Sequence, residues 1–147
     1  MSDVIAVLGL GEAGSLLAGD LVTAGAAVRG FDPKVSAPAG VAPAGSDAEA
    51  VAGAGLVLSV NSASDAVAAL DASLGALRPG AVWADLNTAA PSVKQRLAAL
   101  GGAHGIPVTD VAMMAPVPGN GLRVPMLASG GEAGYVAATL RGHGGCV

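Results

Sequence analysis

Three glycines near the amino terminus, Gly9, Gly11 and Gly14, form the motif with the clearest chemical meaning. The first permits a sharp turn, the second lets a pyrophosphate approach the backbone, and the third lets a helix pack closely on a strand. The helix that follows offers free N–H groups and a positive dipole end to an anion. Asp32 follows at the distance expected of a carboxylate that binds ribose hydroxyls. The predicted dinucleotide-binding residues are Gly9, Leu10, Gly11, Glu12, Ala13, Gly14 and Asp32.

The segments around this motif indicate how it is positioned. The apolar run Val4 to Leu8 predicts a buried parallel strand, residues 15–22 have helical spacing, and a second strand ends at Asp32. Ser46 and Glu49 have the spacing of a capping box before another helix. We expect further strands at 56–60, 81–86, 106–111 and 125–129, and helices at 47–52, 65–77, 91–100 and 132–140. This alternation predicts a Rossmann-type, doubly wound α/β fold with a mostly parallel sheet and helices on both faces.

Small polar residues follow the ends of three predicted strands: Asn61, Thr88, and the loop Pro118-Gly119-Asn120. Ligands of open α/β sheets bind at the carboxyl ends of the strands, so we expect a nicotinamide ribose, a nicotinamide and a substrate to converge there. Asn61 and Thr88 are candidate cofactor residues, and Pro118, Gly119 and Asn120 are candidate substrate-binding residues. A role as a helix cap or turn residue is an equal alternative for Asn61 and Thr88.

The charges near the motif bear on which cofactor binds. Asp32 would repel a 2′-phosphate, so NAD is preferred over NADP. Lys34 and Arg29 are close enough in sequence to turn toward such a phosphate, and NADP therefore stays open.

The other titratable residues suggest no chemistry of their own. We interpret Lys34 and Lys94 as solvated surface charges, and His104 and His143 as loop residues. No cluster has the spacing of metal ligands or of a nucleophilic triad. We therefore expect no metal site and no catalytic residue in this chain.

Composition excludes several classes of protein. The chain has 147 residues, of which 52% are hydrophobic and 12% charged, and we expect one domain over residues 1–147. A net charge of −4 argues against nucleic acid and anionic membranes as partners. No apolar run is long enough for a membrane span, and Met1-Ser2-Asp3 lacks the basic region of a signal peptide. The single Cys146 fits a reducing, cytoplasmic location.

Four segments occur in an order that resembles a known family. They are Gly9 to Gly14, Ala84-Asp85-Leu86-Asn87-Thr88, Pro91-Ser92-Val93, and Asp110 to Gly119. Together they resemble the N-terminal domain of the β-hydroxyacid dehydrogenases, the superfamily of 6-phosphogluconate and 3-hydroxyisobutyrate dehydrogenases. The family's substrate loop reads Asp-Ala-Pro-Val-Ser-Gly-Gly, whereas this chain has Ala115-Pro116-Val117-Pro118-Gly119-Asn120. The loop is similar to that of a divergent 6-phosphogluconate dehydrogenase-like branch, and its departure bears on the substrate rather than on the cofactor.

The resemblance implies the cofactor domain of an oxidoreductase that transfers a hydride between a nicotinamide and a β-hydroxyacid-type substrate. In that family a lysine and an asparagine on a later helix act as the acid/base and the substrate anchor. The chain ends at Val147, before any such helix, so we expect the helical domain to be absent, the chain alone to be catalytically incompetent, and a homodimer to form. Two alternatives are the cofactor domain of a related imine reductase and a stand-alone dinucleotide-binding module without catalysis.

Overall fold

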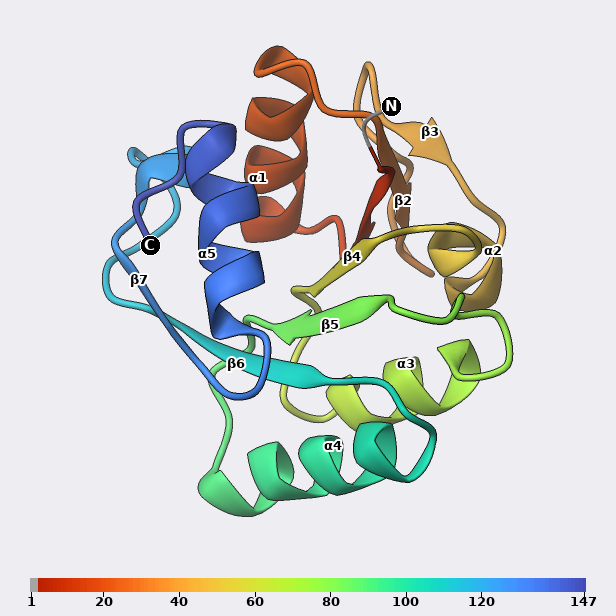
Figure 1. Cartoon of the computed structure of the whole chain (residues 1–147). Coiled ribbons are helices and arrows are strands. Elements are labelled where there is room, and N and C mark those ends of the chain that lie inside the picture. Colours follow the sequence, from red (N-terminus) through yellow and green to blue (C-terminus); the bar gives the residue numbers. More distant parts are fainter. Residues whose placement is uncertain (1–2) are drawn as a thin grey trace.

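The structure is a computed structural model that describes residues 3–147 (Figure 1). Met1 and Ser2, on which the expectation about a signal peptide partly depends, lie outside the described residues. Over this range one sheet has the strand order β3-β2-β1-β4-β5-β6-β7. The strands are β1 (Ile5–Leu8), β2 (Val28–Phe31), β3 (Ala42–Pro43), β4 (Leu56–Ser59), β5 (Val82–Asp85), β6 (Val108–Met113) and β7 (Met126–Ser129). The helices are α1 (Glu12–Thr23), α2 (Asp47–Val51), α3 (Ala66–Ser73), α4 (Pro91–Ala103), α5 (Ala133–Gly142) and the short 3₁₀ helix η1 (Gly121–Arg123).

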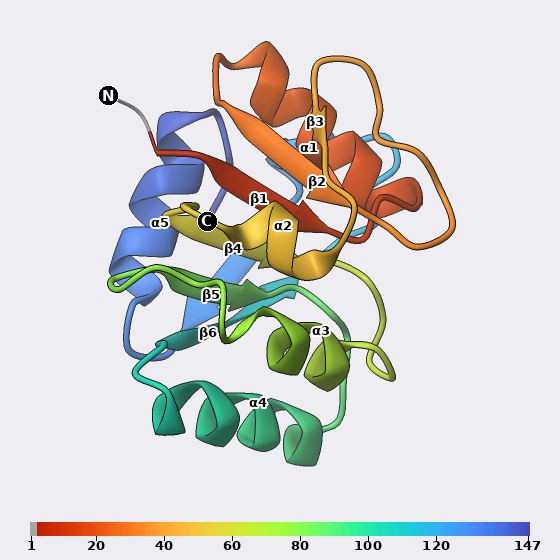
Figure 2. The same cartoon turned by 90° about the vertical axis from the view of Figure 1, so that its right-hand side faces the viewer.

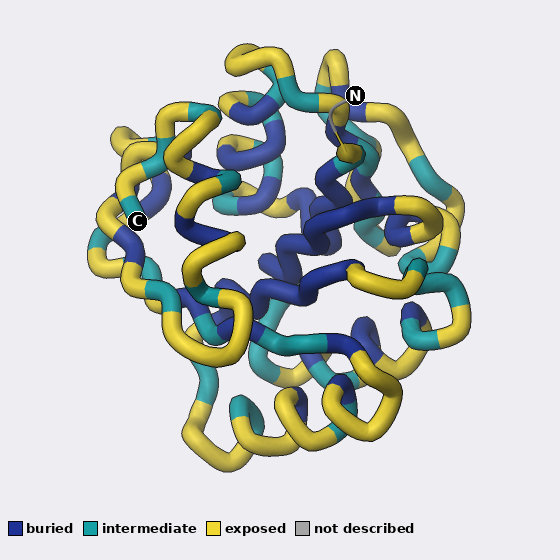
Figure 3. The backbone as a smooth tube through the Cα atoms, viewed as in Figure 1, coloured by how far each residue is buried: buried dark blue, intermediate teal, exposed yellow. Residues whose placement is uncertain are grey.

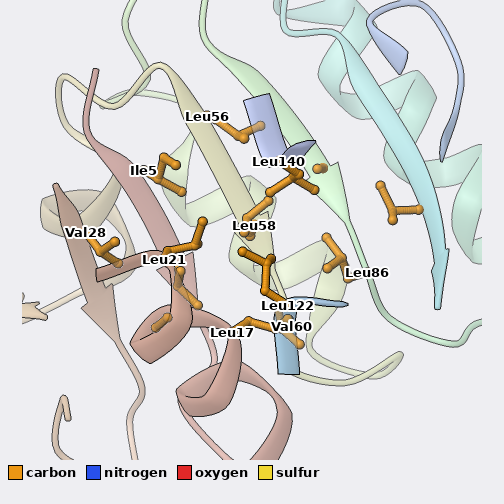
Figure 4. Packing of buried hydrophobic residues seen from close by; sticks show 14 of the residues in the cluster. Ile5, Leu17, Leu21, Val28, Leu56, Leu58, Val60, Leu86, Leu122 and Leu140 are labelled. Carbon is orange, nitrogen blue, oxygen red and sulfur yellow. The ribbon is translucent and has the colours of Figure 1, made fainter. Parts of the chain in front are cut away.

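Helices cover both faces of the sheet (Figures 1 and 2). On one face Leu17 and Leu21 of α1 and Leu140 of α5 join a buried apolar cluster with the strands (Figure 4). On the other face Leu70 of α3 and Leu97 of α4 belong to a second cluster, to which α2 also contributes. This arrangement confirms the predicted doubly wound α/β fold.

The central strands are apolar on both sides because each side meets a helix layer. In β1, Ile5 and Val7 pack into the first cluster, whereas Ala6 and Leu8 pack into the second. A continuous apolar run is typical of such doubly covered parallel strands. Figure 3 shows the buried centre of the sheet and the exposed outer faces of the helices. The carboxyl ends of β1, β2, β4 and β5 therefore meet along one edge of the sheet, since these strands run parallel.

Several element boundaries differ from the sequence-based expectation. Helix α1 begins at Glu12, inside the glycine motif, and β6 begins at Val108, after Pro107, which has no N–H to donate to a neighbouring strand. Strand β3 was not predicted, because two residues carry no periodic signal. Strand β7 pairs antiparallel with β6, since a loop rather than a crossover helix joins them. The Ser46 cap is confirmed, because the Glu49 N–H donates to Ser46 Oγ at 3.1 Å, but Glu49 Oε2 accepts from the Gly45 N–H rather than from that of Ser46.

No helix in the range 3–147 has both the length and the apolar character that a membrane crossing requires.

Candidate functional site

The glycine motif forms a tight turn between β1 and α1. Gly9 has a φ of +98°, and a Cβ at this position would overlap the Val60 carbonyl group. A Cβ at Gly14 would overlap the carbonyl oxygen of Gly9. Both positions therefore require glycine for packing. Gly11 differs, because apart from its neighbours along the chain no atom lies within 4 Å of the place its Cβ would take.

The space above Gly11 adjoins the amino end of α1. Gly11 is the N-cap residue of this 12-residue helix, and no side chain caps its first turn. The first N–H groups of an uncapped helix have no intrahelical partners, and they carry the positive end of the helix dipole. An open approach over Gly11 to these N–H groups is an arrangement suited to a phosphate.

Asp32 joins the end of β2 to the glycine turn. Its Oδ2 accepts a hydrogen bond from the Leu10 N–H at 2.8 Å, and its Oδ1 accepts from the Lys34 N–H at 2.8 Å and the Val35 N–H at 3.3 Å. Burial alone would raise the pKa of Asp32, but the three N–H groups and the charge of Lys34 together hold the pKa below its usual value of 3.8. Asp32 is therefore an anion at neutral pH.

A groove of about 460 Å³ brings most of the predicted cofactor residues together. It lies where the strand order reverses between β1 and β4, the position at which doubly wound sheets bind ligands. The lining residues are Gly11, Glu12, Ala13, Gly14, Asp32, Pro33, Lys34, Val60, Asn61, Ser62, Ser64 and Asp65. We call this the switch-point groove.

Acidic side chains gather near the Asp32 end of this groove. Burial, followed by repulsion from Asp32 and Asp65, raises the pKa of Asp47. Arg29 does not turn toward the groove in this structure, because its Nη1 donates to three backbone carbonyls at the end of α2, with 2.6 Å to that of Ala52. Lys34 is the one lysine or arginine among the lining residues of the groove.

A chain of polar side chains crosses the ends of β4 and β5. Asn61 Oδ1 accepts from the Ser62 N–H at 2.9 Å, from Ser59 Oγ at 3.3 Å and from Asn87 Nδ2 at 3.0 Å. Asn87 Nδ2 also donates to Asp85 Oδ1 at 2.7 Å. Sequence analysis predicted Asn61 as a site residue, whereas Asn87 and Asp85 were noted only within the segment 84–88 and were given no role of their own.

Lys94 completes this chain, and its interpretation as a solvated surface charge is wrong. Its Nζ lies 2.5 Å from Asp85 Oδ2 and 2.7 Å from Asp110 Oδ1. The Lys94 side chain is 18% exposed and that of Asp85 only 1%. Parallel pairing places Asp85 opposite Asp110, and α4 brings the lysine to the two carboxylates. The sequence did contain a signal for this ion pair. Two aspartates, Asp85 and Asp110, lie near the ends of predicted strands, and two carboxylates on adjacent strands need a cation between them.

The remaining predicted residues lie in two other hollows. Thr88 lines a hollow of about 480 Å³ at the ends of β5 and β6, next to Asn87 and Lys94. Gly119 and Asn120 line a hollow against the side of α1, where the Leu122 N–H donates to Asp20 Oδ2 at 2.8 Å.

The predicted substrate loop does not line the same hollow as any predicted cofactor residue. Pro118 is exposed, and Asn120 Nδ2 donates to the Pro116 carbonyl at 2.8 Å. The structure thus places this loop apart from the switch-point groove. Among residues 3–147, no three side chains of the metal-ligating types are grouped to hold a metal ion.

Comparison with known proteins identifies relatives of the chain. Residues 4–141 match the family described as the NAD binding domain of 6-phosphogluconate dehydrogenase. A probable 3-hydroxyisobutyrate dehydrogenase of Mycobacterium bovis is 36% identical over 142 residues, covering 92% of this chain and 43% of that protein. An NAD-dependent L-serine dehydrogenase of Pseudomonas aeruginosa is 34% identical over 145 residues, covering 92% of this chain and 44% of that protein.

The fold of the chain is also similar to that of a solved dehydrogenase structure. The Mycobacterium tuberculosis 3-hydroxyisobutyrate dehydrogenase with L-serine has a TM-score of 0.88 and 29% identity, covering all of this chain and 54% of that chain. The chain spans less than half the length of the two curated relatives. Its fold, its glycine turn and the match over residues 4–141 agree, and the chain belongs to the family of NAD-binding domains of 6-phosphogluconate dehydrogenase, related to the β-hydroxyacid dehydrogenases.

Proposed function

We propose that the switch-point groove binds a nicotinamide adenine dinucleotide. In this proposal Asp32 accepts a hydrogen bond from the adenosine ribose, and the pyrophosphate lies over Gly11 at the amino end of α1. The nicotinamide half extends past Asn61 toward Thr88. The observation that carries the proposal is the empty space at Gly11, in a turn where Gly9 and Gly14 are both closely packed.

NAD is the proposed cofactor rather than NADP. The carboxylate of Asp32 accepts from a ribose hydroxyl but repels a 2′-phosphate, and Asp47 and Asp65 add negative charge near the same end of the groove. Arg29 is bound to the end of α2, which leaves Lys34 as the cation available to a phosphate there. The Pseudomonas aeruginosa relative is named as an NAD-dependent enzyme, which supports the same choice.

The proposed reaction is the oxidation of a β-hydroxyacid or the reverse reduction. When bound, the nicotinamide ring accepts or supplies the hydride. The side chains at the ends of β4 and β5 orient this half of the cofactor, and the hollow beside Thr88 leaves room for a small substrate. The relatives are named for 3-hydroxyisobutyrate and L-serine, which are both 3-hydroxy carboxylic acids.

The general acid/base is proposed to come from a second domain, since the chain spans less than half the length of its curated relatives. Lys94 is unsuited to that task, because its ammonium group is held between two carboxylates. A substrate contact from Pro118, Gly119 or Asn120 would require the loop to move away from Asp20, to which the Leu122 N–H is bonded.

The substitution Gly11→Val tests the cofactor site. The new side chain would occupy the open space at Gly11 and weaken NAD⁺ binding by about 100-fold, the factor that about 2.7 kcal/mol of lost interaction produces. Isothermal titration calorimetry measures the dissociation constant, and circular dichroism checks the fold. The matched control is Gly19→Val in the same helix, where the space is equally open but lies away from the groove. A folded Gly11→Val protein with unchanged affinity would contradict the proposal.

A further inference from the structure

Two asparagine amides connect the Lys94–Asp85 ion pair, whose carboxylate is buried, to the switch-point groove. The connection runs from Lys94 to Asp85, then to Asn87 and to Asn61, through contacts of 2.5, 2.7 and 3.0 Å. An asparagine side chain accepts hydrogen bonds at its oxygen and donates at its nitrogen. The orientation of each amide in such a row of hydrogen bonds therefore depends on whether the groups at its two ends donate or accept.

The groups at the two ends of this row of hydrogen bonds can each act in only one way, as a donor or as an acceptor. At one end Asp85, paired with Lys94, is a carboxylate and can only accept. It therefore faces the nitrogen of Asn87. At the other end the backbone N–H of Ser62 can only donate, and it faces the oxygen of Asn61 at 2.9 Å. The direction of both amides follows from these partners alone.

One consequence is the set of groups left for a ligand. Asn61 Oδ1 is used by three donors, and Asn87 Nδ2 is used by acceptors on both Asp85 and Asn61. Asn61 lines the switch-point groove, and Asn87 lines the hollow beside Thr88. In the described part of the chain, Asn61 Nδ2 and Asn87 Oδ1 make no hydrogen bond to protein.

We infer that the Asp85–Lys94 ion pair is a positioning device that makes Asn87 an acceptor toward the nicotinamide half of the dinucleotide, beside Asn61, which the Ser62 N–H orients as a donor. Asn61 Nδ2 would donate to a phosphate or ribose oxygen, and Asn87 Oδ1 would accept from a ribose hydroxyl or the carboxamide N–H. This inference rests on the proposed cofactor site.

A role in stability alone accounts poorly for this ion pair. Removing the Asp85 carboxylate from water is costly, and apolar side chains of similar size often serve a buried position at least as well. Asp85 is 1% exposed and its oxygens accept from Lys94 and Asn87, so the pair is fully used by its neighbours. Its link to two amides at the groove gives it a task that apolar side chains cannot perform.

The substitution Asp85→Asn would reverse this direction. Lys94 has only donors, so it takes the oxygen of the new amide, and the NH₂ group of that amide then faces the NH₂ group of Asn87. If Asn87 turns over, its oxygen meets the oxygen of Asn61, which the Ser62 N–H holds in place. In either arrangement Asn87 loses one of its two hydrogen bonds, either that to residue 85 or that to Asn61. In the second arrangement Asn87 would also present a donor to the ligand where it now presents an acceptor.

The test compares NAD⁺ with ADP, which lacks the nicotinamide half. For Asp85→Asn we expect NAD⁺ binding weaker by about tenfold, which corresponds to about 1.4 kcal/mol, and ADP binding within about twofold of the unaltered chain. The matched control is Asp3→Asn, which makes the same chemical change in an exposed ion pair with Arg78. It should change neither affinity.

A second variant separates direction from stability. In Asp85→Asn combined with Lys94→Met, no donor-only group constrains the new amide, which is free to turn its oxygen to Asn87. We expect NAD⁺ affinity to recover to within about threefold of the unaltered chain. A structural role alone predicts no recovery. If the single variant does not fold, the NAD⁺ affinity of the folded double variant decides the matter.

Three results would overturn the inference. They are equal losses of NAD⁺ and ADP affinity in Asp85→Asn, an unchanged NAD⁺ affinity in that variant, and a double variant no better than tenfold weaker for NAD⁺. An unaltered chain that binds neither nucleotide would instead contradict the proposed function, and the inference with it.

Discussion

Asp32 serves both the turn and the proposed ligand. A carboxylate has about four lone-pair positions, and three backbone N–H groups occupy three of them here. Oδ1 accepts from Lys34 and Val35, whereas Oδ2 accepts from Leu10 alone. Asp32 therefore has room at Oδ2 for about one ribose hydroxyl rather than for both. Asp32 Oδ2 thus accepts from the glycine turn and, in the proposed complex, from the ribose as well.

Asp32→Asn should weaken the discrimination between the two cofactors. We expect the unaltered chain to bind NAD⁺ more tightly than NADP⁺ by about tenfold or more, because a 2′-phosphate would meet the carboxylate. The amide removes that charge, so the ratio of the two dissociation constants should approach one. Titration calorimetry with both cofactors measures the ratio, and Asp71→Asn on the exposed side of α3 is the control. Tighter NADP⁺ binding by the unaltered chain would show that Asp32 does not face the ribose.

The lowered pKa of Asp32 predicts how stability responds to acid. The folded-state pKa lies below 3.8, so the ionised carboxylate favours the folded chain. This contribution is fully present above pH 3.8 and is lost as the pH falls from there through the folded-state pKa. Urea unfolding should therefore show the unaltered chain more stable than Asp32→Asn at pH 7, with a difference that shrinks in strong acid. A difference that does not vary with pH would contradict the assignment.

The residues whose position in the fold was predicted correctly from the sequence make their contacts with near neighbours. Gly9, Gly11 and Gly14 serve one turn, and spacing alone predicts their relation to the strand before and the helix after. The partners of Lys94 and Arg29 were not predicted, because they lie on other elements. A cation is identified as buried or exposed only when the strands beneath it are known to be adjacent.

At the scale of elements, the close packing of α1 on the glycine turn sets the shape of the groove. Gly14 is buried, and a Cβ there would overlap the carbonyl of Gly9. Leu17 and Leu21 on the same face of α1 are fully buried. The helix can lie this close to β1 only because its first turn carries no side chain at Gly14. This closeness directs the amino end of the helix at the groove.

The paired substitutions Gly14→Ala and Gly19→Ala test this packing. Both replace a glycine of α1 by the best helix former, which stabilises an unstrained helix by about 1 kcal/mol. At Gly19 the new methyl group meets nothing within 4 Å, so the chain should become more stable. At Gly14 the methyl group overlaps the Gly9 carbonyl, and we expect a loss of about 1–3 kcal/mol in the free energy of unfolding. Thermal unfolding compares them, and equal changes in Tm would argue against the close contact.

The type of an element, helix or strand, could be predicted where the sequence has a clear apolar run or helical spacing. The direction of a strand could not be predicted where an irregular loop leads into it. The strands β1, β4 and β5 follow apolar runs, and the helices follow caps and glycine stops. The antiparallel direction of β7 depends on how the loop of residues 114–125 returns along α1 and η1, for which the sequence has no periodic signal. The same loop was predicted to meet the cofactor site, and the bond to Asp20 keeps it beside α1 instead.

At the scale of the whole molecule, the two helix layers do not cover the sheet equally. Strand β7 is an edge of the sheet, with Met126 and Leu127 pointing to opposite faces. Met126 is buried in the cluster beneath α1 and α5, whereas Leu127 is 65% exposed beyond the layer of α2, α3 and α4. We expect an edge strand with an exposed leucine to be a surface at which the sheets of two molecules associate.

Leu127→Lys should reduce self-association of the chain. We expect the unaltered chain to form a dimer, with a mass in solution twice the 13.9 kDa of one chain, because a net charge of −4 over 147 residues opposes association only weakly. A lysine on the bare face of β7 removes apolar area and blocks edge-to-edge pairing, as charged residues do on natural edge strands. Light scattering at several concentrations measures the mass. Leu16→Lys on α1, where the leucine is 39% exposed in the helix layer on the other side of the sheet from Leu127, is the control and should stay dimeric. A monomeric unaltered chain, or a dimer that Leu127→Lys leaves intact, would show that β7 is not the contact.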